Sequence, residues 1–364
     1  MKNRLSIGII GTRGIPNEYG GYEAAVQELA PRLAERGHKV VVYCSLAQKS
    51  RVTEWKGARL IYNVDPEKYL GSAGQFVYDF LSNISARQQK HDVIFHMGYT
   101  SDSVWFKVWD PRAAHITNMD GLEWKRSKYS KQVRKFLYYA EKLAAINSHA
   151  LIADNKGIED YLNKKYKTPV LQIAYGVEIP KSFSEESIHK YNLRKQEYDL
   201  VIARMVPENM IETIIQAKID SADSVPLILF GNHTKYRDEL ISKYKEQRIV
   251  FKDADFNKEV LDGIRHFSRY YIHGHSVGGT NPSLLEAMAS RCRIIAHDNV
   301  FNRHVLSGNG EYFTNKTQLS SVFNCQRIVI KPEQVENNIN LLMEHYNWEQ
   351  ICDLYERAAL QYSR

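Results

Sequence analysis

Residues 271–289, YIHGHSVGGTNPSLLEAMA, join an apolar run, a glycine-rich bend and a helix start without interruption. Asn281 is a favoured N-cap residue and Pro282 a favoured first helical residue, so we expect a helix to begin here. Its free backbone N–H groups and the positive end of its dipole would face whatever lies over residues 278–280. The stretch therefore predicts an anion site that suits a diphosphate. An ordinary strand-to-helix turn is the alternative interpretation.

Glu286 lies about one turn into this expected helix. A carboxylate there could accept hydrogen bonds from the hydroxyl groups of a sugar ring. The simpler interpretation is a surface glutamate. The coincidence of two glycines, the N-cap residue and the proline favours a ligand site over that interpretation.

Short β-rich runs alternate with amphipathic segments along the whole chain, which indicates two successive βα series. The segment 178–199 is poorer in apolar residues and separates the two series. The sequence predicts an α/β protein of the GT-B type, with two Rossmann-like domains whose mostly parallel sheets face a central cleft. We expect the domains at 1–180 and 181–347. Residues 348–364 are expected to form an amphipathic helix, and its return to the first domain is one option.

Composition limits the possible classes of function. The 364 residues are 43% hydrophobic, which is enough for two buried cores, and no stretch approaches the ~18 apolar residues of a membrane span. The N-terminal residues show no signal-peptide pattern, so we expect a cytoplasmic protein. The four cysteines are scattered and the histidines lack a ligand spacing, which argues against a zinc site, a disulfide framework or a catalytic metal.

The formal net charge of +7 suits a phosphate-rich ligand, a nucleic acid or an anionic membrane surface. Charge alone does not choose among these partners. No known RNA-binding or DNA-binding module is recognisable, so nucleic acid ranks last.

A second glycine-rich loop opens residues 11–37, GTRGIPNEYGGYEAAVQELAPRLAERG. It has neither the G-x-G-x-x-G order of dinucleotide-binding loops nor the Gly-Lys-Ser/Thr of a P-loop. It is also longer than most βα connections. Its polar side chains predict a loop that closes over a substrate, although an ordinary connection is the alternative; these side chains are Arg13, Asn17, Glu18 and Tyr19.

Four motifs in the same order resemble bacterial rhamnosyltransferases of glycosyltransferase family four, which are retaining enzymes of GT-B fold. The motifs are TRGIPNEYGGYE, NMDGLEW, ARMVPEN and HGHSVGGTNPSLLEAMA. The resemblance spans nearly the whole chain. It implies a nucleotide-sugar donor, dTDP-rhamnose in particular, held mainly by the C-terminal domain. It also implies a lipid-linked saccharide acceptor held mainly by the N-terminal domain, a place in capsular or exopolysaccharide synthesis, and no cofactor.

Several positions depart from the wider family in the way that the rhamnosyltransferase subgroup does. The Glu-x7-Glu pattern retains Glu286, expected on the nucleotide ribose, but has Gly278 at the first glutamate position. Of the Arg and Lys that face the diphosphate, Arg204 remains and Asn209 occupies the lysine position. Asp120 stands where a histidine is common. A 6-deoxy sugar would need fewer polar contacts, in keeping with a glycine at position 278.

The resemblance and the motifs together give a set of candidate site residues. Arg204 would stabilise negative charge on the leaving diphosphate, and the alternative for it is a salt bridge at a strand end. Asp120 is a base, an acceptor-positioning residue or a turn residue. Glu208 is a first-turn dipole partner or a donor contact. The predicted donor contacts are Arg204, Glu208, Asn209, His275, Gly278, Gly279, Thr280, Asn281 and Glu286. The predicted acceptor contacts are Gly14, Tyr19, Gly20, Gly21, Asp120 and Glu123.

Two other functions remain open at this point. A sugar-nucleotide epimerase on the same fold would need no acceptor, and a polyanion-binding protein would need no chemistry. Release of nucleotide that depends on an acceptor would separate a transferase from both.

Residues 124–142, WKRSKYSKQVRKFLYYAEK, predict a basic helix at a membrane surface. At helical spacing one apolar stripe would pack on the sheet, and it comprises Tyr129, Val133, Phe136, Ala140 and Leu143. A basic face would point outward with Lys128, Lys131, Lys135 and Lys142. Trp124 and Tyr138 would lie at the headgroup level. The alternative is a solvated charged face, the usual place of such runs.

Overall fold

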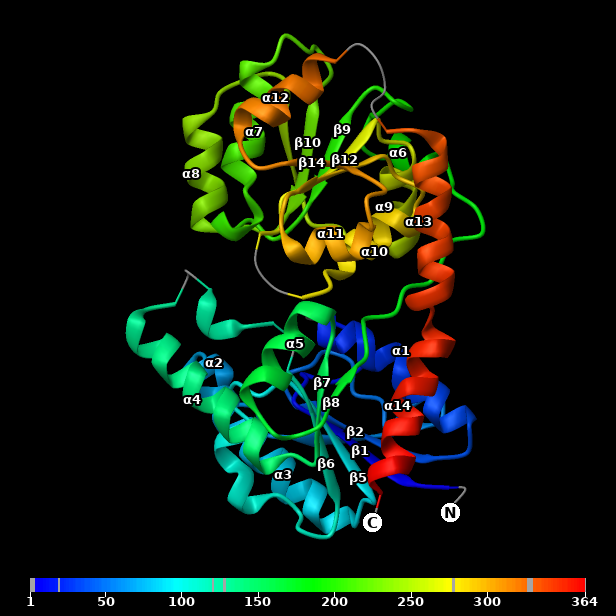
Figure 1. Ribbon diagram of the computed structural model, residues 1–364. Helices are drawn as coiled ribbons and strands as arrows, with labels where there is room; N and C mark the ends of the chain where they lie inside the picture. Colours follow the sequence, from blue (N-terminus) through cyan, green and yellow to red (C-terminus); the bar gives the residue numbers. More distant parts are fainter. Residues whose placement is uncertain are drawn as a thin grey trace. The chain divides into compact units, whose positions relative to one another are not determined.

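The computed structural model describes residues 4–18, 20–119, 121–126, 129–276, 279–325 and 330–363. The chain forms two compact units (Figure 1). The first unit combines residues 1–176 with residues 348–364, and the second unit comprises residues 177–347. The boundary expected from composition, at 180/181, is close to this division.

A sheet of eight strands forms the centre of the first unit, in the order β3-β4-β2-β1-β5-β6-β7-β8. All neighbouring strands are parallel except β3, which runs antiparallel to β4. The strands are β1 (Ser6–Ile10), β2 (Lys39–Ser45), β3 (Glu54–Trp55), β4 (Ala58–Asn63), β5 (Val93–Met97), β6 (Ala114–Asn118), β7 (Ala150–Ala153) and β8 (Val170–Gln172).

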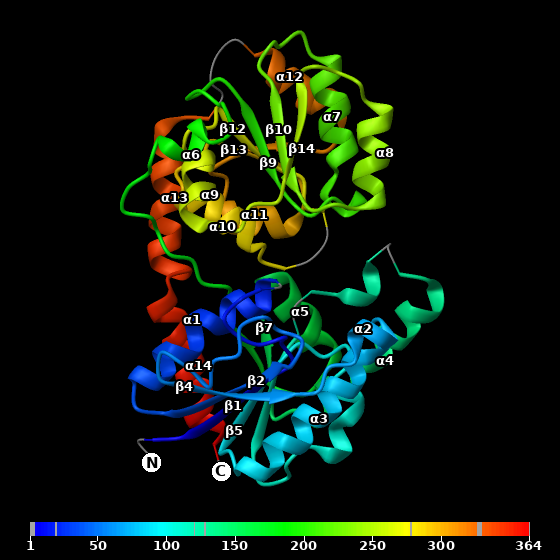
Figure 2. The same ribbon diagram turned by 180° about the vertical axis from the view of Figure 1, so that it is seen from behind.

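Helices cover both faces of this sheet. On one face α1 and α14 share a core with the strands, and on the other α3 packs through Ala86 (Figures 1 and 2). The helices and 3-10 segments are α1 (Gly21–Glu35), α2 (Glu67–Leu70), α3 (Ala73–Gln89), η1 (Ser103–Val108), η2 (Glu123–Lys125), α4 (Lys131–Asn147), α5 (Lys156–Lys165) and α14 (Trp348–Tyr362).

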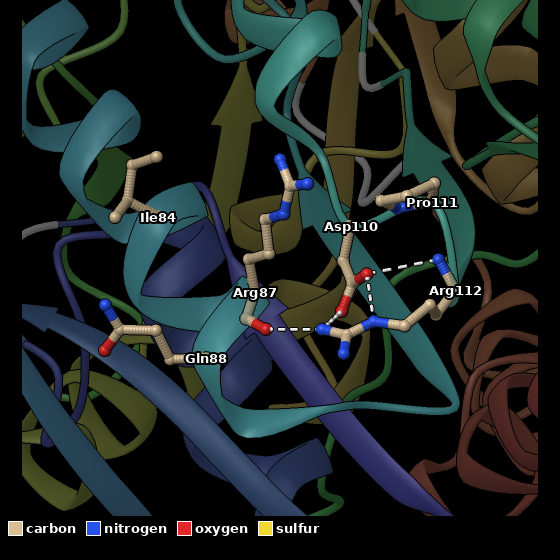
Figure 3. Close-up of a pocket in the computed structure, with 6 residues that line it drawn as sticks. All are labelled: Ile84, Arg87, Gln88, Asp110, Pro111 and Arg112. Carbon is tan, nitrogen blue, oxygen red and sulfur yellow. Dashed lines mark hydrogen bonds and ion pairs between the residues drawn. The ribbon is translucent and has the colours of Figure 1, made fainter.

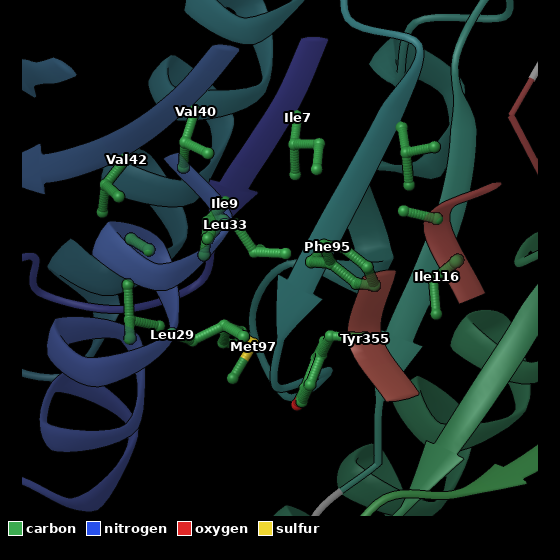
Figure 4. Packing of buried hydrophobic residues seen from close by; sticks show 14 of the residues in the cluster. Ile7, Ile9, Leu29, Leu33, Val40, Val42, Phe95, Met97, Ile116 and Tyr355 are labelled. Carbon is green, nitrogen blue, oxygen red and sulfur yellow. The ribbon is translucent and has the colours of Figure 1, made fainter. Parts of the chain in front are cut away.

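The core of the first unit depends on α14, which follows the second unit in sequence. Trp348, Ile351 and Tyr355 are buried with the side chains of β1, β5 and α1. Figure 4 shows Tyr355 beside Phe95 in this core. The Tyr355 ring lies 5.2 Å from that of Phe95, and its hydroxyl accepts a hydrogen bond from Asn118 at 3.2 Å. The last helix is therefore part of the first unit's interior.

We expect Ile351→Ala to lower the free energy of unfolding of the first unit by about 2–5 kcal/mol, because it leaves a cavity in a closed core. The side chain of Ile351 is 1% exposed. Leu354→Ala is the matched control on the same helix, since Leu354 is 36% exposed; its cost should stay within about 0.5 kcal/mol. Denaturant unfolding measures both, and equal costs would contradict the packing.

The second unit is built on a parallel sheet of six strands in the order β11-β10-β9-β12-β13-β14. Its strands are β9 (Asp199–Ile202), β10 (Leu227–Gly231), β11 (Ile249–Asp253), β12 (Tyr270–His273), β13 (Ile294–His297) and β14 (Glu311–Phe313). Its helices and 3-10 segment are α6 (Glu186–His189), η3 (Pro207–Asn209), α7 (Ile211–Asp220), α8 (Lys235–Lys243), α9 (Lys258–His266), α10 (Pro282–Ala289), α11 (Val300–Leu306), α12 (Lys316–Asn324) and α13 (Pro332–His345). The predicted α/β class with two mostly parallel sheets is confirmed.

A buried ionic network holds the amino end of β9 beside β12. Asp199, the first residue of β9, is fully buried and accepts hydrogen bonds from Lys218 at 2.8 Å and from Arg269 at 2.6 and 2.8 Å. Asp223 contacts the same two cations. Because each buried charge has an opposite partner, the network fixes the two strands without leaving an isolated ion.

The basic helix differs from its prediction. It begins at Lys131, where Ser130 caps Val133 N–H, and it packs mainly against η1 and η2 instead of the sheet. Its inward face comprises Leu137, Ala140, Glu141, Leu143, Ala144 and Ala145. Val133 is 40% exposed and Tyr129 precedes the helix, so the predicted stripe is wrong in its first half. Among the described residues no helix is both long and apolar enough to cross a bilayer.

Candidate functional site

The carboxyl ends of β9 and β12 bring together the two motifs that the sequence analysis placed in the second half. The two strands are parallel neighbours, so the loops that follow them leave the sheet at the same edge. The loop after β9 contains η3, and the loop after β12 leads into α10. In parallel sheets this edge is where ligands bind.

The predicted helix start is confirmed. Asn281 is the N-cap of α10, with its side-chain oxygen accepting a hydrogen bond from Ser283 N–H at 2.9 Å, and Pro282 is the first helical residue. Thr280, just before the cap, is 7% exposed, and Gly279 is partly buried. Gly278 lies outside the described residues. Asn281 also accepts from Leu284 N–H at 3.0 Å through its carbonyl, so the cap satisfies the first turn and what α10 presents at the edge of the sheet is the positive end of its dipole.

Asn209 joins the two loops. Its Nδ2 donates to the Arg204 carbonyl at 2.8 Å, and its Oδ1 accepts from Nδ1 of His275 at 2.9 Å. The side chain is 8% exposed. Both its polar ends thus have protein partners, so Asn209 positions the loops, a different role from the donor contact that its place in the phosphate motif predicts.

Backbone contacts reinforce this connection. The Glu208 carbonyl accepts hydrogen bonds from Ser276 N–H at 3.0 Å and from the Ser276 hydroxyl at 2.7 Å. A side chain at Gly274 would place its Cβ 2.1 Å from the carbonyl oxygen of Asn209. Only glycine permits so close an approach, so the G in the HGH motif is needed for loop-to-loop packing.

Arg204 is exposed, and its guanidinium forms no ion pair or hydrogen bond with any residue of the described part of the chain. The salt bridge considered as its alternative role is therefore absent there. Asn209 donates a hydrogen bond to the Arg204 carbonyl, which fixes the backbone at this residue. The N–H donors of the guanidinium remain available to a ligand. A guanidinium of this kind can bind phosphate oxygens with two parallel hydrogen bonds.

Glu286 faces both solvent and the protein. Its side chain is 34% exposed, and its Oε2 pairs with Nη2 of Arg265 in α9. Arg265 is only 2% exposed and also contacts Asp262 at 3.3 Å. Arg265 is not predictable from the sequence, because nothing in the local pattern of α9 distinguishes it from a surface arginine.

His273 is a second residue that sequence reasoning did not assign. It ends β12, is 5% exposed, and its Nε2 has no hydrogen-bond partner among the described residues. Burial, together with the neighbouring His275 and His297, lowers the pKa of His273 well below its ordinary value. The ring is therefore neutral near pH 7 and can donate or accept a single hydrogen bond. Its place directly before the glycine-rich bend was an available signal.

The N-terminal loop of the first unit is anchored at its charged residues. Arg13 is buried and pairs with Asp65 at 2.6 Å and Glu67 at 2.7 Å. Glu18 accepts from the N–H groups of Lys49 and Ser50, both at 3.0 Å. We expected these polar side chains to close over a substrate. In the structure Arg13 and Glu18 instead bind neighbouring segments of the first unit. Asn17 accepts from Gly20 N–H at 3.2 Å, and Tyr19 lies outside the described residues.

Three glycines of this loop have different surroundings. Gly14 is buried with a φ of +104°, and a Cβ there would lie 2.5 Å from Cys44. It therefore has a packing role in place of the predicted acceptor contact. Gly20 is the N-cap of α1 and Gly21, its first residue, is exposed. These two remain at an accessible helix start beyond the carboxyl end of β1.

Asp120 lies outside the described residues, but its neighbours are well fixed. Glu123, in η2, is buried and pairs with Arg126 at 2.7 Å, so this carboxylate is engaged within its own loop. Trp124 donates to the carboxylate of Glu141 at 2.8 Å. That carboxylate is 1% exposed and also accepts from Tyr161, Lys165 and Tyr166. Glu141 thereby anchors the segment that follows Asp120.

A cavity in the first unit lies elsewhere. It measures about 580 Å³ and is lined by Ile84, Arg87, Gln88, Asp110, Pro111 and Arg112 (Figure 3). Asp110 binds Arg112 through two bonds of 2.8 Å, just before β6 begins. The cavity is thus at the amino end of the strands and contains none of the predicted site residues.

We expect Asn209→Ala to lower the free energy of unfolding of the second unit by about 1–3 kcal/mol, because it removes the two hydrogen bonds by which the buried Asn209 side chain joins Arg204 to His275. Asn337→Ala is the control, since Asn337 is exposed and makes only a surface hydrogen bond to Asn309 at 3.2 Å. Thermal unfolding compares the two variants. An equal loss in both would show that Asn209 does not hold the loops.

Comparison with known proteins supports the fold. Residues 4–178 match the model of a domain of unknown function, DUF1972. No curated protein sequence matches the chain. Among solved structures, sucrose-phosphate synthase from Thermosynechococcus elongatus is similar with a TM-score of 0.82 at 16% identity, covering 98% of both chains.

Two further structures are similar over the same length. Anabaena HepE, in complex with UDP and glucose, has a TM-score of 0.76 at 15% identity, covering 98% of this chain and 100% of its own. A trehalose-phosphate synthase from Burkholderia xenovorans, in complex with glucose-6-phosphate, has a TM-score of 0.70 at 10% identity, with the same coverage. At these identities the similarity establishes the fold, and the chain has the GT-B fold.

Proposed function

We propose that this protein is a retaining glycosyltransferase whose second unit binds a nucleoside diphosphate sugar. The observation that carries the proposal is the carboxyl edge of the second sheet. There the unpaired guanidinium of Arg204 and the N-terminus of α10 lie on loops that Asn209 joins. The GT-B structures that resemble the chain include one in complex with UDP-glucose, which is consistent with such a donor.

The chemistry needs stabilisation of the leaving group. Cleavage of the bond between the anomeric carbon and the phosphate oxygen places negative charge on the nucleoside diphosphate. Arg204 offers two parallel donors to the phosphate oxygens, and the N-terminus of α10 adds the positive end of its helix dipole. Asn209 fixes the backbone from which Arg204 projects, so only the side-chain torsions of this arginine must adjust when the phosphate binds.

Retention of configuration can proceed without a protein base. The acceptor hydroxyl attacks on the face that the leaving group departs from, and the departing phosphate oxygen takes its proton. In that scheme Asp120 orients the acceptor instead of removing its proton. We assign the acceptor to the first unit, near Gly20, Gly21 and the segment anchored by Glu141.

We further propose rhamnose as the transferred sugar, dTDP-rhamnose as the donor and a lipid-linked saccharide as the acceptor, in capsular or exopolysaccharide synthesis. The motif resemblance supports this choice. So do the glycine at position 278 and the structural use of Asn209, since both remove polar contacts that a fully hydroxylated sugar would use. A 6-deoxy sugar loses less from their absence.

A thermal-shift panel of nucleotide sugars tests the donor. At a hundred times its dissociation constant the true donor should stabilise the protein by ~2.7 kcal/mol. We expect dTDP-rhamnose to give the largest shift and UDP-glucose a smaller one. Arg204→Ala should reduce the shift and leave the unliganded melting temperature unchanged, because Arg204 has no partner in the described structure to lose. The matched control is Arg194→Ala, an 82% exposed arginine of the same unit.

Two results would count against this assignment. A larger shift with UDP-glucose would overturn the donor, and full donor binding by Arg204→Ala would remove this arginine from the site. Nucleotide release that does not depend on an added acceptor would favour an enzyme other than a transferase.

The surface around α4 supports a further part of the proposal, docking on an anionic membrane. Lys131, Lys135 and Lys142 are exposed and have no ion-pair partner in the described part of the chain. Tyr139, on the same helix, is 55% exposed. Figures 1 and 2 show α2 beside α4, and α2 adds Tyr69, which is 83% exposed.

The aromatic residues of this surface differ from those expected. Trp124 is partly buried and bonded to Glu141, and the Tyr138 ring packs against Trp124 and lies under Lys165 at 3.8 Å. Tyr69 and Tyr139 therefore take the headgroup role that we expected of Trp124 and Tyr138. Lys128 lies outside the described residues.

We expect salt-sensitive binding to vesicles that contain anionic lipid, and its loss in the double variant Lys131→Glu/Lys135→Glu. Each lysine near such a surface contributes ~1 kcal/mol, and the attraction is screened by added salt. Lys235→Glu/Lys245→Glu carries the same charge change on exposed residues of the second unit and should still bind. Co-sedimentation measures all three. Binding that survives in the first variant would assign this face to solvent.

A further inference from the structure

The ion pair between Arg265 and Glu286 divides the two oxygens of one carboxylate. Oε2 of Glu286 contacts Nη2 of Arg265, whereas Oε1 forms no hydrogen bond with any described residue. Glu286 is 34% exposed and Arg265 is 2% exposed. One oxygen is thus directed into the protein by a buried cation, and the other remains available to a ligand.

The surroundings of Arg265 keep this division in place. Its Nη1 contacts Asp262 at 3.3 Å, and its carbonyl accepts from the Ser268 hydroxyl at 2.7 Å and the Cys292 thiol at 3.1 Å. Asp262 is in turn paired with Lys258 at 2.6 Å. Because a buried guanidinium without its carboxylates would be an isolated charge, Arg265 cannot release Glu286 at low cost.

The number of free oxygens determines which nucleoside sugar the carboxylate can satisfy. Ribose presents two neighbouring hydroxyl groups, which a carboxylate binds best with one oxygen each. A 2′-deoxyribose presents only the 3′-hydroxyl. A carboxylate with one committed oxygen matches the deoxyribose, whereas the two hydroxyl groups of a ribonucleotide must share the remaining oxygen.

We propose that Arg265 is a positioning residue that makes Glu286 a single-acceptor site and thereby favours 2′-deoxyribonucleoside diphosphates. The inference rests on the proposed function, since it takes Glu286 as the contact to the nucleoside sugar. It adds the cause of the nucleotide preference, which lies in α9 and not in the ligand-facing motif.

Titration calorimetry with UDP and dUDP tests the inference, because these nucleotides differ only in the 2′-hydroxyl. The wild-type protein should bind dUDP at least as tightly as UDP. In Arg265→Met both oxygens of Glu286 become available, and the ratio of affinities should move toward UDP by about fivefold, the effect of one hydrogen bond. A residue that only stabilises the fold would weaken both nucleotides equally and leave the ratio unchanged.

Controls separate the possible failures. Arg291→Met removes a partly exposed arginine that pairs with Glu336 at 2.5 Å and should leave the ratio unchanged. If Arg265→Met does not fold, Arg265→Leu, which also removes the donor to Oε2, should move the ratio in the same direction. An unchanged ratio in the variant that folds, or a wild-type preference for UDP, overturns the inference. If the wild-type protein binds neither nucleotide nor dTDP, the proposed function itself fails.

Discussion

The close approach of two loops at the edge of the second sheet is the constraint on which the candidate site depends. Gly274 lets the segment after β12 lie against the carbonyl of Asn209, and Asn209 then bonds to both loops. The network around Asp199 fixes the same two strands at their opposite ends. The backbone at Arg204 and the N-terminus of α10 therefore belong to one rigid frame, although they are far apart in sequence.

Charges in the second unit fall into two groups with different roles. Lys218 and Arg269 pair with carboxylates inside the unit and serve the fold. Arg204 is exposed and unpaired within the described chain. Leaving one cation without a protein partner gives up a salt bridge of small value at the surface. It keeps the full hydrogen-bonding capacity of that group for an anion.

The sequence was sufficient where local physics decides the structure. The N-cap at Asn281, the proline after it and the alternation of strands and helices predicted α10 and the α/β class. It was insufficient where a partner comes from a distant element. The anchoring of Arg13 by Asp65, and of Glu286 by Arg265, depends on tertiary contacts that no local pattern contains. The error in α4 has the same origin, because helix periodicity shows which residues share a face but not how far the neighbouring elements extend.

The return of α14 to the first unit has a consequence for synthesis on the ribosome. Residues 348–363 supply Trp348, Ile351 and Tyr355 to a core whose other members lie before residue 177. The second unit, which is continuous in sequence, has been translated in full before this helix emerges. The earlier residues of the first unit must therefore wait with an open apolar face until the second unit has been made. Chaperone demand should be concentrated in that interval, on the half of the chain that is synthesised first.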